Sequence, residues 1–349
     1  MESSFKATPL YTTEFGAAYV GDALAFLRQM ERDSVDLILT SPPFALERKK
    51  EYGNVDANGY VPWFMEFAVE FKRVLRDSGS LVIDIGGSWI RGQPTRSLYH
   101  FELVIALCKT LGLHLAQEFY WYNPSKLPSP AEWVTVRRTR VKDAIDPIWW
   151  LSKTPNPKAS NWRVLKPYSD SMKKLLENGY RAKLRPSGHD ISEHFSKDNQ
   201  GAIPPNLLSI ANTDSNSAYL RECRLRGLKP HPARFPHDLP KFFIRFLTDP
   251  GDTVVDPFAG SNVTGEVADE LGRRWLAFEL VEKYLEASKF RFPSLYEQSS
   301  LFGMQEKALG RQTPLRHVER EVEKATSQPV LLEPQTEYEI EDDHLDEKP

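Results

Sequence analysis

The sequence alternates short apolar runs with amphipathic segments, and this alternation constrains the fold more than any other feature. Residues 34–40 and 80–87 are apolar, and each run has the length of a buried strand. Between them, residues 60–76 carry apolar side chains at helical spacing and end at an Asp-Ser-Gly stop. The same order continues with an expected helix over 101–112, a strand over 114–123 and an apolar stretch over 144–153. This order predicts an α/β fold in which helices cover both faces of a sheet.

The alternation stops near residue 154 and resumes near residue 231. Residues 154–230 are rich in Pro, Asn, Ser, Lys and Arg and contain few periodic runs. Beyond them the pattern predicts a helix over 238–248, a strand over 253–258, a helix over 262–272 and a strand over 274–280. We therefore expect one α/β domain in two halves, 17–153 and 231–295, with an irregular module inserted between them.

Charge is distributed unevenly along the 349 residues. Residues 153–241 hold 16 Lys and Arg against 8 Asp and Glu, whereas residues 333–349 hold eight acids and one lysine. A basic middle suits contacts with nucleic-acid phosphates, although charge alone fits a solvated face equally well. The extension 296–349 ends in the acidic segment, which we expect to be disordered.

Several classes of protein are disfavoured by what the sequence lacks. No apolar run is long enough to span a bilayer, and the first residues lack the core of a signal peptide, so we expect a cytoplasmic protein. The two cysteines, Cys108 and Cys223, have neither zinc nor redox spacing. They predict structural thiols and no metal site.

The motif Ser-Pro-Pro-Phe at residues 41–44 directly follows the first apolar run. Proline cannot continue a central strand and it stiffens a turn, so the motif should end the strand and hold its side chains fixed. A hydroxyl and a backbone carbonyl placed in this way can accept hydrogens from an amine, and the aromatic ring offers a face for stacking. Taken alone, the motif is more simply a turn after a strand.

A second motif reads strand, glycine-containing turn, helix, strand and then an acid. Gly260 permits a tight turn, and either Ser261 or Asn262 can cap the helix that follows. Asp256 ends the first strand and Glu279 ends the second, at the edge where open α/β sheets bind ligands. The loop lacks a full G-x-G-x-x-G pattern, so an adenosine ligand without phosphates fits it better than a dinucleotide. A plain turn with a capping acid is the alternative.

In this order, the two motifs resemble those of the β-class DNA amino-methyltransferases. The catalytic motif of that family is Ser, Asp or Asn before Pro-Pro and an aromatic, and its cofactor motif is an Asp-Pro-Phe-x-Gly loop, here residues 256–260. The β class places the catalytic motif first, then target recognition, then the cofactor loop. Further segments resemble the N4-cytosine branch, and its PvuII-type members in particular: GDALAFL, RKKEYGN, NPSKLPSP, RPSGHDI, IPPNLL and HPARFPHDLP. The likeness extends over about residues 17–292.

The resemblance implies a circularly permuted, Rossmann-like methyltransferase sheet that binds S-adenosyl-L-methionine. Glu279 would bind the ribose hydroxyls, and Asp22 would hold the cofactor near its adenine, although it is equally suited to cap a helix. The residues implied in cofactor binding are Asp22, Asp256, Phe258, Gly260, Ser261 and Glu279. Asn262 stands where many relatives carry a second glycine. Because asparagine tolerates a left-handed backbone, we expect the loop to keep its shape.

The resemblance also assigns the catalytic motif and the target-recognition region. Ser41, Pro42, Pro43 and Phe44 would form the catalytic motif, and residues 154–230 would be the target-recognition region. The base would have to leave the duplex to reach this motif. Position and charge predict DNA contacts from Arg48, Lys49, Lys50, Arg185 and His189, with further positive charge from residues 137–142, Lys173 and Lys174. For His189, a structural role in its loop is the simpler alternative.

The implied activity is methylation of cytosine N4 at a specific site in double-stranded DNA, as the protective half of a type II restriction–modification pair. The target implied by the PvuII-type likeness is CAGCTG. Adenine-N6 methylation by the same fold is an alternative, and Ser41 in place of Asp or Asn favours cytosine. A non-catalytic DNA-binding protein is the alternative from another class. We expect a monomer in a bacterial or archaeal cytoplasm, held at the nucleoid by DNA, whose cognate endonuclease shares its target site without needing to bind it.

Overall fold

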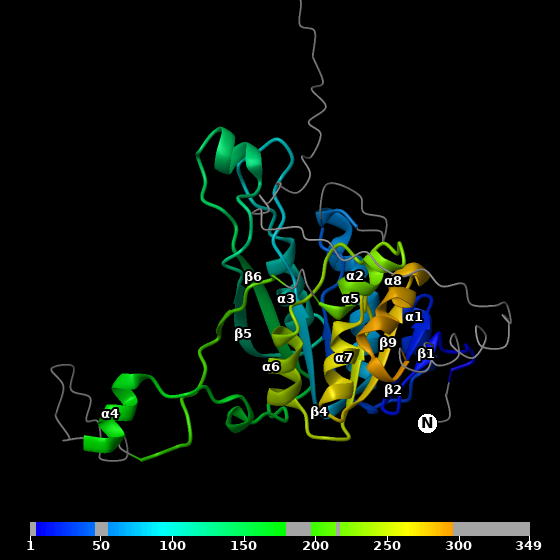
Figure 1. Cartoon of the computed structure of the whole chain (residues 1–349). Coiled ribbons are helices and arrows are strands. Elements are labelled where there is room, and N and C mark those ends of the chain that lie inside the picture. Colours follow the sequence, from blue (N-terminus) through cyan, green and yellow to red (C-terminus); the bar gives the residue numbers. More distant parts are fainter. Residues whose placement is uncertain (1–4, 46–54, 179–196, 214–216, 296–349) are drawn as a thin grey trace, which may run out of the picture. The chain divides into compact units, whose positions relative to one another are not determined.

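The computed structural model describes residues 5–45, 55–178, 197–213 and 217–295. Their strands form one mixed sheet in the order β1-β2-β9-β8-β3-β4-β6-β5-β7 (Figure 1). The strands are β1 (Tyr11–Thr12), β2 (Gly16–Val20), β3 (Val35–Thr40), β4 (Leu75–Asp84), β5 (His114–Tyr122), β6 (Ile145–Ser152), β7 (Leu207–Ser209), β8 (Thr253–Asp256) and β9 (Arg274–Glu279). The five strands β2, β9, β8, β3 and β4 run parallel, and β6 runs antiparallel to both of its neighbours.

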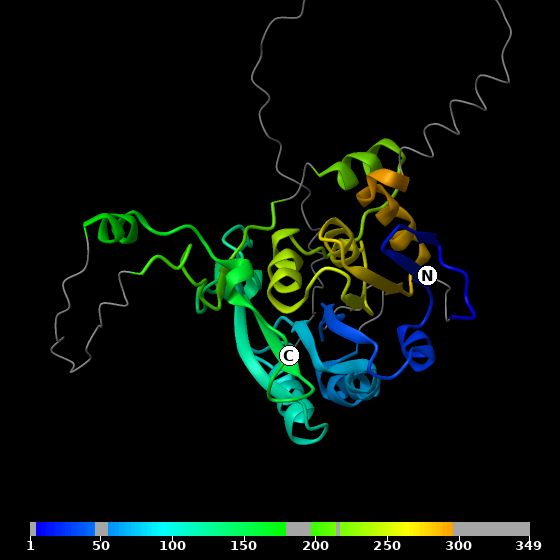
Figure 2. The same cartoon turned by 90° about the horizontal axis from the view of Figure 1, so that it is seen from below.

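Helices cover both faces of this sheet, as the alternation predicts. They are α1 (Ala23–Gln29), α2 (Ala57–Val74), α3 (Tyr99–Lys109), α4 (Asp170–Asn178), α5 (Ala218–Leu225), α6 (Asp238–Leu247), α7 (Val263–Glu270) and α8 (Glu282–Ser288). Short helical turns lie at Glu132–Val136, Asn161–Val164 and Lys289–Arg291. Figure 2 shows the blue and cyan helices on one side of the sheet and the yellow and orange helices on the other. None of the helices in the described ranges is long and apolar enough to cross a membrane.

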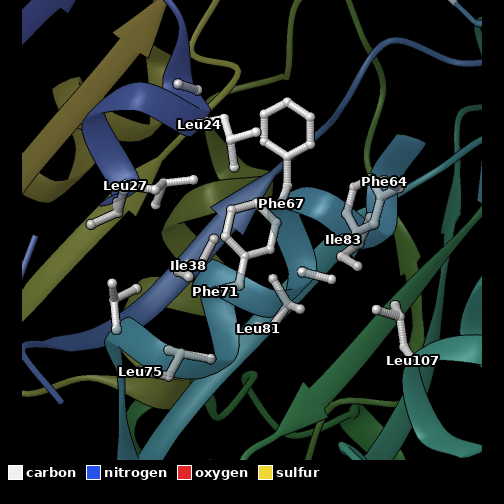
Figure 3. Close-up of a cluster of buried hydrophobic side chains, with 14 of the residues drawn as sticks. Leu24, Leu27, Ile38, Phe64, Phe67, Phe71, Leu75, Leu81, Ile83 and Leu107 are labelled. Carbon is white, nitrogen blue, oxygen red and sulfur yellow. The ribbon is translucent and has the colours of Figure 1, made fainter. Parts of the chain in front are cut away.

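Two apolar cores lie on opposite faces of the sheet. One is built from α1, α2 and α3 against β3 and β4, where Phe64 and Phe71 of α2 are fully buried (Figure 3). The other packs α6 and α7 against β8 and β9, with Phe243 and Val267 fully buried. Every residue of β3 is buried, because a parallel strand in the middle of such a sheet is covered on both faces.

One predicted boundary is wrong. The expected helix stop, Asp-Ser-Gly at residues 77–79, lies inside β4, because α2 ends at Val74 and the strand begins at once. The register between β3 and β4 shifts between Val35 and Leu37, which identifies the stop residues as a bulge. A Cβ on Gly79 would lie 3.1 Å from the Val35 carbonyl oxygen, so the glycine allows this close approach.

The segment 154–230 is partly integrated into the sheet. Strand β7 pairs in parallel with β5, with Tyr120 opposite Leu207. On α5, Tyr219 and Cys223 are buried in a small cluster with Ala287 of α8. No periodic pattern predicts this three-residue strand, because a run so short shows neither helical nor strand spacing.

The strand order reverses between the adjacent parallel strands β3 and β8, so the chain continues from them toward opposite sides of the sheet. From β3 it passes through α2 to β4 on one side, whereas from β8 it passes through α7 to β9 on the other side. The carboxyl ends of these two adjacent parallel strands therefore lie at the position where ligands usually bind in such sheets. Both sequence motifs lie at these two strand ends.

Candidate active site

Ser41 follows the last residue of β3 and is hydrogen bonded to the end of the neighbouring strand. Its Oγ donates to Oδ2 of Asp84, the last residue of β4, at 3.1 Å. The other oxygen of Asp84 has no hydrogen-bond partner among the described residues, although the side chain is almost fully buried. The hydroxyl proton of Ser41 is thereby committed to a carboxylate, and both lone pairs of Oγ stay available as acceptors.

Asp84 belongs to a small charged cluster. Asp146 on β6 is the nearby acid that raises the pKa of Asp84, and Lys126 binds Asp146 through both carboxylate oxygens at 2.9 Å. Burial is the main reason that the pKa of Asp84 lies well above its usual range, and the Ser41 hydrogen bond and the Lys126 charge act in the opposite direction. A perturbed carboxyl beside a candidate acceptor is typical of a functional site.

Phe44 lies against a backbone that has no side chain to obstruct it. A Cβ on Gly86 would lie 2.5 Å from Cε2 of Phe44 and 3.0 Å from Asp146, so only glycine fits there. The hydroxyl of Tyr99 donates to the Gly86 carbonyl, and a hydrogen bond with the Ala45 backbone partly offsets the rise that burial causes in the pKa of Tyr99. Tyr99 thus ties the loop of the catalytic motif to the end of β4.

Asp256 joins the two sequence motifs. Its Oδ1 accepts from the hydroxyl of Thr40, the residue before Ser41, at 2.8 Å, and its Oδ2 accepts from Thr264 at 2.7 Å. Oδ1 also accepts from the Phe258 amide at 3.1 Å. Burial raises the pKa of Asp256 to about 6. The hydrogen bond to Thr40 spans 216 residues of sequence and fixes the glycine loop beside the catalytic strand.

Glu279 shapes the same loop from the next strand. Its Oε2 accepts from the Gly260 amide at 2.8 Å and its Oε1 from the Val281 amide at 2.8 Å. Gly260 has φ +53°, and a Cβ there would lie 3.1 Å from the ring of His231. Burial raises the pKa of Glu279, and the amide contacts oppose that shift. Each carboxylate oxygen keeps a lone pair with which to accept a ligand hydroxyl.

Asn262, not Ser261, caps α7. Its Oδ1 accepts from the Gly265 amide at 3.1 Å, and its φ of 53° confirms that the loop adopts a left-handed backbone at this position. Its amide nitrogen donates to the Tyr11 hydroxyl at 2.9 Å. Ser261 is instead held by the buried guanidinium of Arg291, which donates to both its carbonyl and its hydroxyl.

Two further predicted cofactor residues have clear local surroundings. The Phe258 ring packs between Trp63 and Phe67 of α2, with centroid distances of 5.8 and 5.1 Å. Asp22 caps α1, and its Oδ1 accepts from the Leu24 amide at 3.0 Å. Asp22 follows β2 at the carboxyl edge of the sheet, so the capping prediction is confirmed and its cofactor role stays a prediction.

The loop suits S-adenosylmethionine better than a nucleotide with phosphates. Residues 256–263 contain no Lys or Arg, whereas a phosphate site needs positive charge or free amides. The Gly260 amide is already used by Glu279. Two buried acids, Asp256 and Glu279, flank the loop and favour a ligand with hydroxyl donors and positive charge.

The structure brings the described predicted site residues to one edge of the sheet, namely Ser41, Pro42, Pro43, Phe44, Asp22, Asp256, Phe258, Gly260, Ser261 and Glu279. The predicted DNA contacts Arg48, Lys49, Lys50, Arg185 and His189 lie outside the described residues. Sequence reasoning missed Asp84, Asp146 and Lys126. Only Asp84 could have been found from the sequence. It is an acid at the end of the expected strand that follows the Ser-Pro-Pro-Phe strand along the chain.

Comparisons with known proteins agree with this geometry. Residues 35–290 match the family model described as DNA methylase. The chain is 53% identical over 292 residues to the type II methyltransferase M.PvuII of Proteus hauseri, covering 83% of this chain and 87% of that protein. It is 27% identical to M.BamHI of Bacillus amyloliquefaciens over 78% of this chain and 56% of that protein. The solved structure of the PvuII DNA methyltransferase (cytosine-N4-specific) superposes with a TM-score of 0.69 and 46% identity, covering 82% of this chain and 90% of that one.

Proposed function

The chain belongs to the DNA methylase family, and from that premise we propose that it methylates N4 of cytosine at a specific site in double-stranded DNA, with S-adenosylmethionine as methyl donor. One observation carries the proposal: Ser41 donates its only proton to Asp84 at 3.1 Å, beside a cofactor loop tied to the same strand through Thr40 and Asp256. The loop that would hold the methyl donor and the serine that would bind the accepting amine are thus held at the ends of adjacent strands.

The amine of cytosine is a weak nucleophile because its lone pair is delocalised into the ring. Hydrogen-bond acceptors at its two N–H groups favour the tetrahedral nitrogen of the transition state. Ser41 Oγ serves as one acceptor, since Asp84 takes its proton, and the Pro42 carbonyl serves as the other. The proline pair limits backbone motion, so these acceptors need no reorganisation when the base arrives.

S-adenosylmethionine supplies an electrophilic methyl group when it is bound. The residues that would hold it are Glu279, through its carboxylate, and Gly260 and Phe258, through the shape of the loop. The cytosine ring, flipped from the duplex, stacks on Phe44, whose position depends on Gly86.

Methylation leaves a positive charge on N4, and one N–H proton must then depart. This proton passes to Ser41 Oγ while the hydroxyl proton of Ser41 passes to Asp84, which becomes neutral. The raised pKa of Asp84 makes it a competent proton acceptor. Asp84 then releases the proton to solvent before the next turnover, and no covalent enzyme intermediate forms.

Ser41→Ala tests the acceptor assignment. We expect transfer of tritium from labelled S-adenosylmethionine to DNA to fall by about 100-fold or more, as when a preorganised transition-state hydrogen bond is removed. Cofactor affinity measured by calorimetry should not change. Ser34→Ala is the matched control, since Ser34 precedes β3 at its opposite end and donates to the Glu31 carbonyl at 2.7 Å. A near-normal rate for Ser41→Ala would show that another group accepts the amine hydrogens.

The target base and site need separate measurements. We propose CAGCTG as the target, in the cytoplasm and as part of a restriction–modification pair, on the strength of the 53% identity to M.PvuII. Nucleoside analysis of modified DNA should yield N4-methylcytosine, and N6-methyladenine in its place would overturn the cytosine assignment. Single-molecule sequencing of a plasmid from an expressing host should map the mark to CAGCTG. We further propose that the enzyme acts as a monomer, which sedimentation with and without DNA tests.

A further inference from the structure

An arm, defined as residues 123–144, connects β5 to β6 at the carboxyl edge of the sheet. The two strands end with Tyr122 opposite Ile145, and the Asn123 amide then donates to the Ala144 carbonyl at 2.9 Å. Figure 1 shows the arm projecting beyond the labelled ends of these strands, with one short helical turn, Glu132–Val136, near its tip. Residues 123–130 of the arm belong to a segment that resembles the N4-cytosine branch, and residues 137–142 carry part of the positive charge expected near DNA.

The arm is tied to the loop that follows β4. Asp143 accepts from the indole nitrogen of Trp89 at 2.9 Å and from the guanidinium of Arg96. Arg140 reaches the same loop through the Pro94 carbonyl at 3.0 Å. Lys142 bridges the two sides of the arm by donating to two backbone carbonyls. These contacts hold the arm in one shape before any partner binds.

The tip of the arm carries arginines whose positive charge is not neutralised by any carboxylate among the described residues. Arg137 is paired with Glu132 at 2.6 Å and covers the ring of Trp133. In contrast, Arg138 and Arg140 are exposed and have no carboxylate partner within the described ranges. Two more exposed cations without a carboxylate partner among the described residues are Lys142, nearer the root of the arm, and Arg91, in the loop after β4. Exposed apolar side chains lie among them, namely Leu127 at 77%, Val136 at 70% and Val141 at 86% exposure.

The root of the arm, where β5 ends and β6 begins, lies beside the candidate active site. Lys126 lies on the arm and Asp146 immediately beyond it, and their ion pair lies beside Gly86, on which Phe44 rests. A duplex that delivers a base to Ser41 must therefore lie across the edge from which the arm projects. Uncompensated arginines on a preformed projection suit the phosphates of that duplex.

We infer that the arm is a DNA-binding element, separate from the segment 154–230, that contacts backbone phosphates flanking the flipped base through Arg138 and Arg140. The inference rests on the proposed function, because it takes duplex DNA as the substrate. Phosphate contacts carry no sequence information, so the arm strengthens binding to cognate and unrelated duplexes alike.

The test measures duplex affinity by fluorescence anisotropy across a series of salt concentrations. For the full-length Arg138→Ala/Arg140→Ala variant, we expect the slope of log affinity against log salt to be shallower by about 1.8, since each phosphate contact contributes about 0.9. Affinity should fall by the same factor for a duplex containing CAGCTG and for an unrelated duplex. The matched control is Arg28→Ala/Arg32→Ala, two exposed arginines at and just beyond the end of α1, at the opposite edge of the sheet.

A lysine double variant, Arg138→Lys/Arg140→Lys, keeps the charges and should restore the slope. A slope unchanged from the wild type in the alanine variant would overturn the inference, and so would loss of affinity for the CAGCTG duplex alone. Calorimetry with S-adenosylmethionine checks that each variant is folded. The wild-type protein could show the expected difference in slope from the alanine variant and yet transfer no methyl group. That result would overturn the proposed function and leave the assignment of the arm standing.

Discussion

The pH dependence of methyl transfer tests the role of Asp84 directly. In the mechanism above, the ionised form of Asp84 takes the hydroxyl proton of Ser41, so the rate should rise with pH and level off above the pKa of Asp84. Two neighbours with opposite charge, Asp146 and Lys126, act on that pKa in opposite directions. Removing each of them should therefore move the midpoint of the rate profile in opposite directions.

The strand register gives the expected size of the effect. Asp84 pairs with Ile148, so Asp146, two residues earlier on β6, is its diagonal neighbour on the same face. Such neighbours lie about 7 Å apart. At an effective dielectric constant of about 20, two unit charges at about 7 Å interact by about 2 kcal/mol, which corresponds to roughly 1.5 pH units. Asp146→Asn should lower the midpoint by about that amount, and Lys126→Gln should raise it.

The assay is single-turnover methyl transfer with saturating S-adenosylmethionine and DNA, from about pH 5 to about pH 9. Saturation removes binding from the profile, so the midpoint reports a group in the bound complex. Opposite shifts in the two variants would confirm that Asp84 controls the rate. Shifts in the same direction, or a wild-type midpoint in Asp146→Asn, would refute the reasoning, because no charge acting on Asp84 could then govern the step.

Substitutions at three further positions test the architecture of the site. Gly86→Ala places a Cβ 2.5 Å from the Phe44 ring, so kcat/KM for DNA should fall by about 10-fold or more, with unchanged cofactor affinity in calorimetry. Asn262→Ala should lower the free energy of unfolding in urea by about 1 kcal/mol more than Asn262→Gly, because glycine tolerates φ +53°. The folded-state pKa of Asp256, about 6, lies above its unfolded value of 3.8, so its protonation favours the folded state and stability falls as pH rises between them. Asp256→Asn should therefore remove about 3 kcal/mol of this pH dependence in urea titrations at several pH values. Equal stabilities for the two Asn262 variants, or a pH dependence unchanged in Asp256→Asn, would contradict these assignments.

Much of the fold followed from local sequence patterns. The alternation predicted the central strands and their crossover helices, because buried parallel strands are continuous apolar runs and surface helices show regular spacing. The left-handed backbone at Asn262 was predictable from residue type, and so was the turn at Gly260. The bulge at residues 77–79 was not, since Asp-Ser-Gly also ends helices and only the pairing with β3 distinguishes the two.

The charged cluster of the site could not be predicted in the same way. Asp84 contacts Ser41 because β3 and β4 are adjacent, which a motif search does not reveal. Lys126 and Asp146 meet across the root of the arm, and their approach to Asp84 depends on the register of β6 against β4. Long-range pairing, not residue type, places these three side chains together.

The adjacency of β3 and β8 also explains why the permuted order of the motifs is compatible with catalysis. A methyl donor and an acceptor react only when both are held at one place, and the sheet provides this by pairing two strands whose crossovers leave in opposite directions. Thr40 and Asp256 join the two strand ends by a buried hydrogen bond of 2.8 Å, which holds the cofactor loop beside the catalytic motif. Sequence order affects only the loops that connect the strands. A region that recognises DNA can therefore be inserted between the motifs without disturbing the distance between their reacting groups.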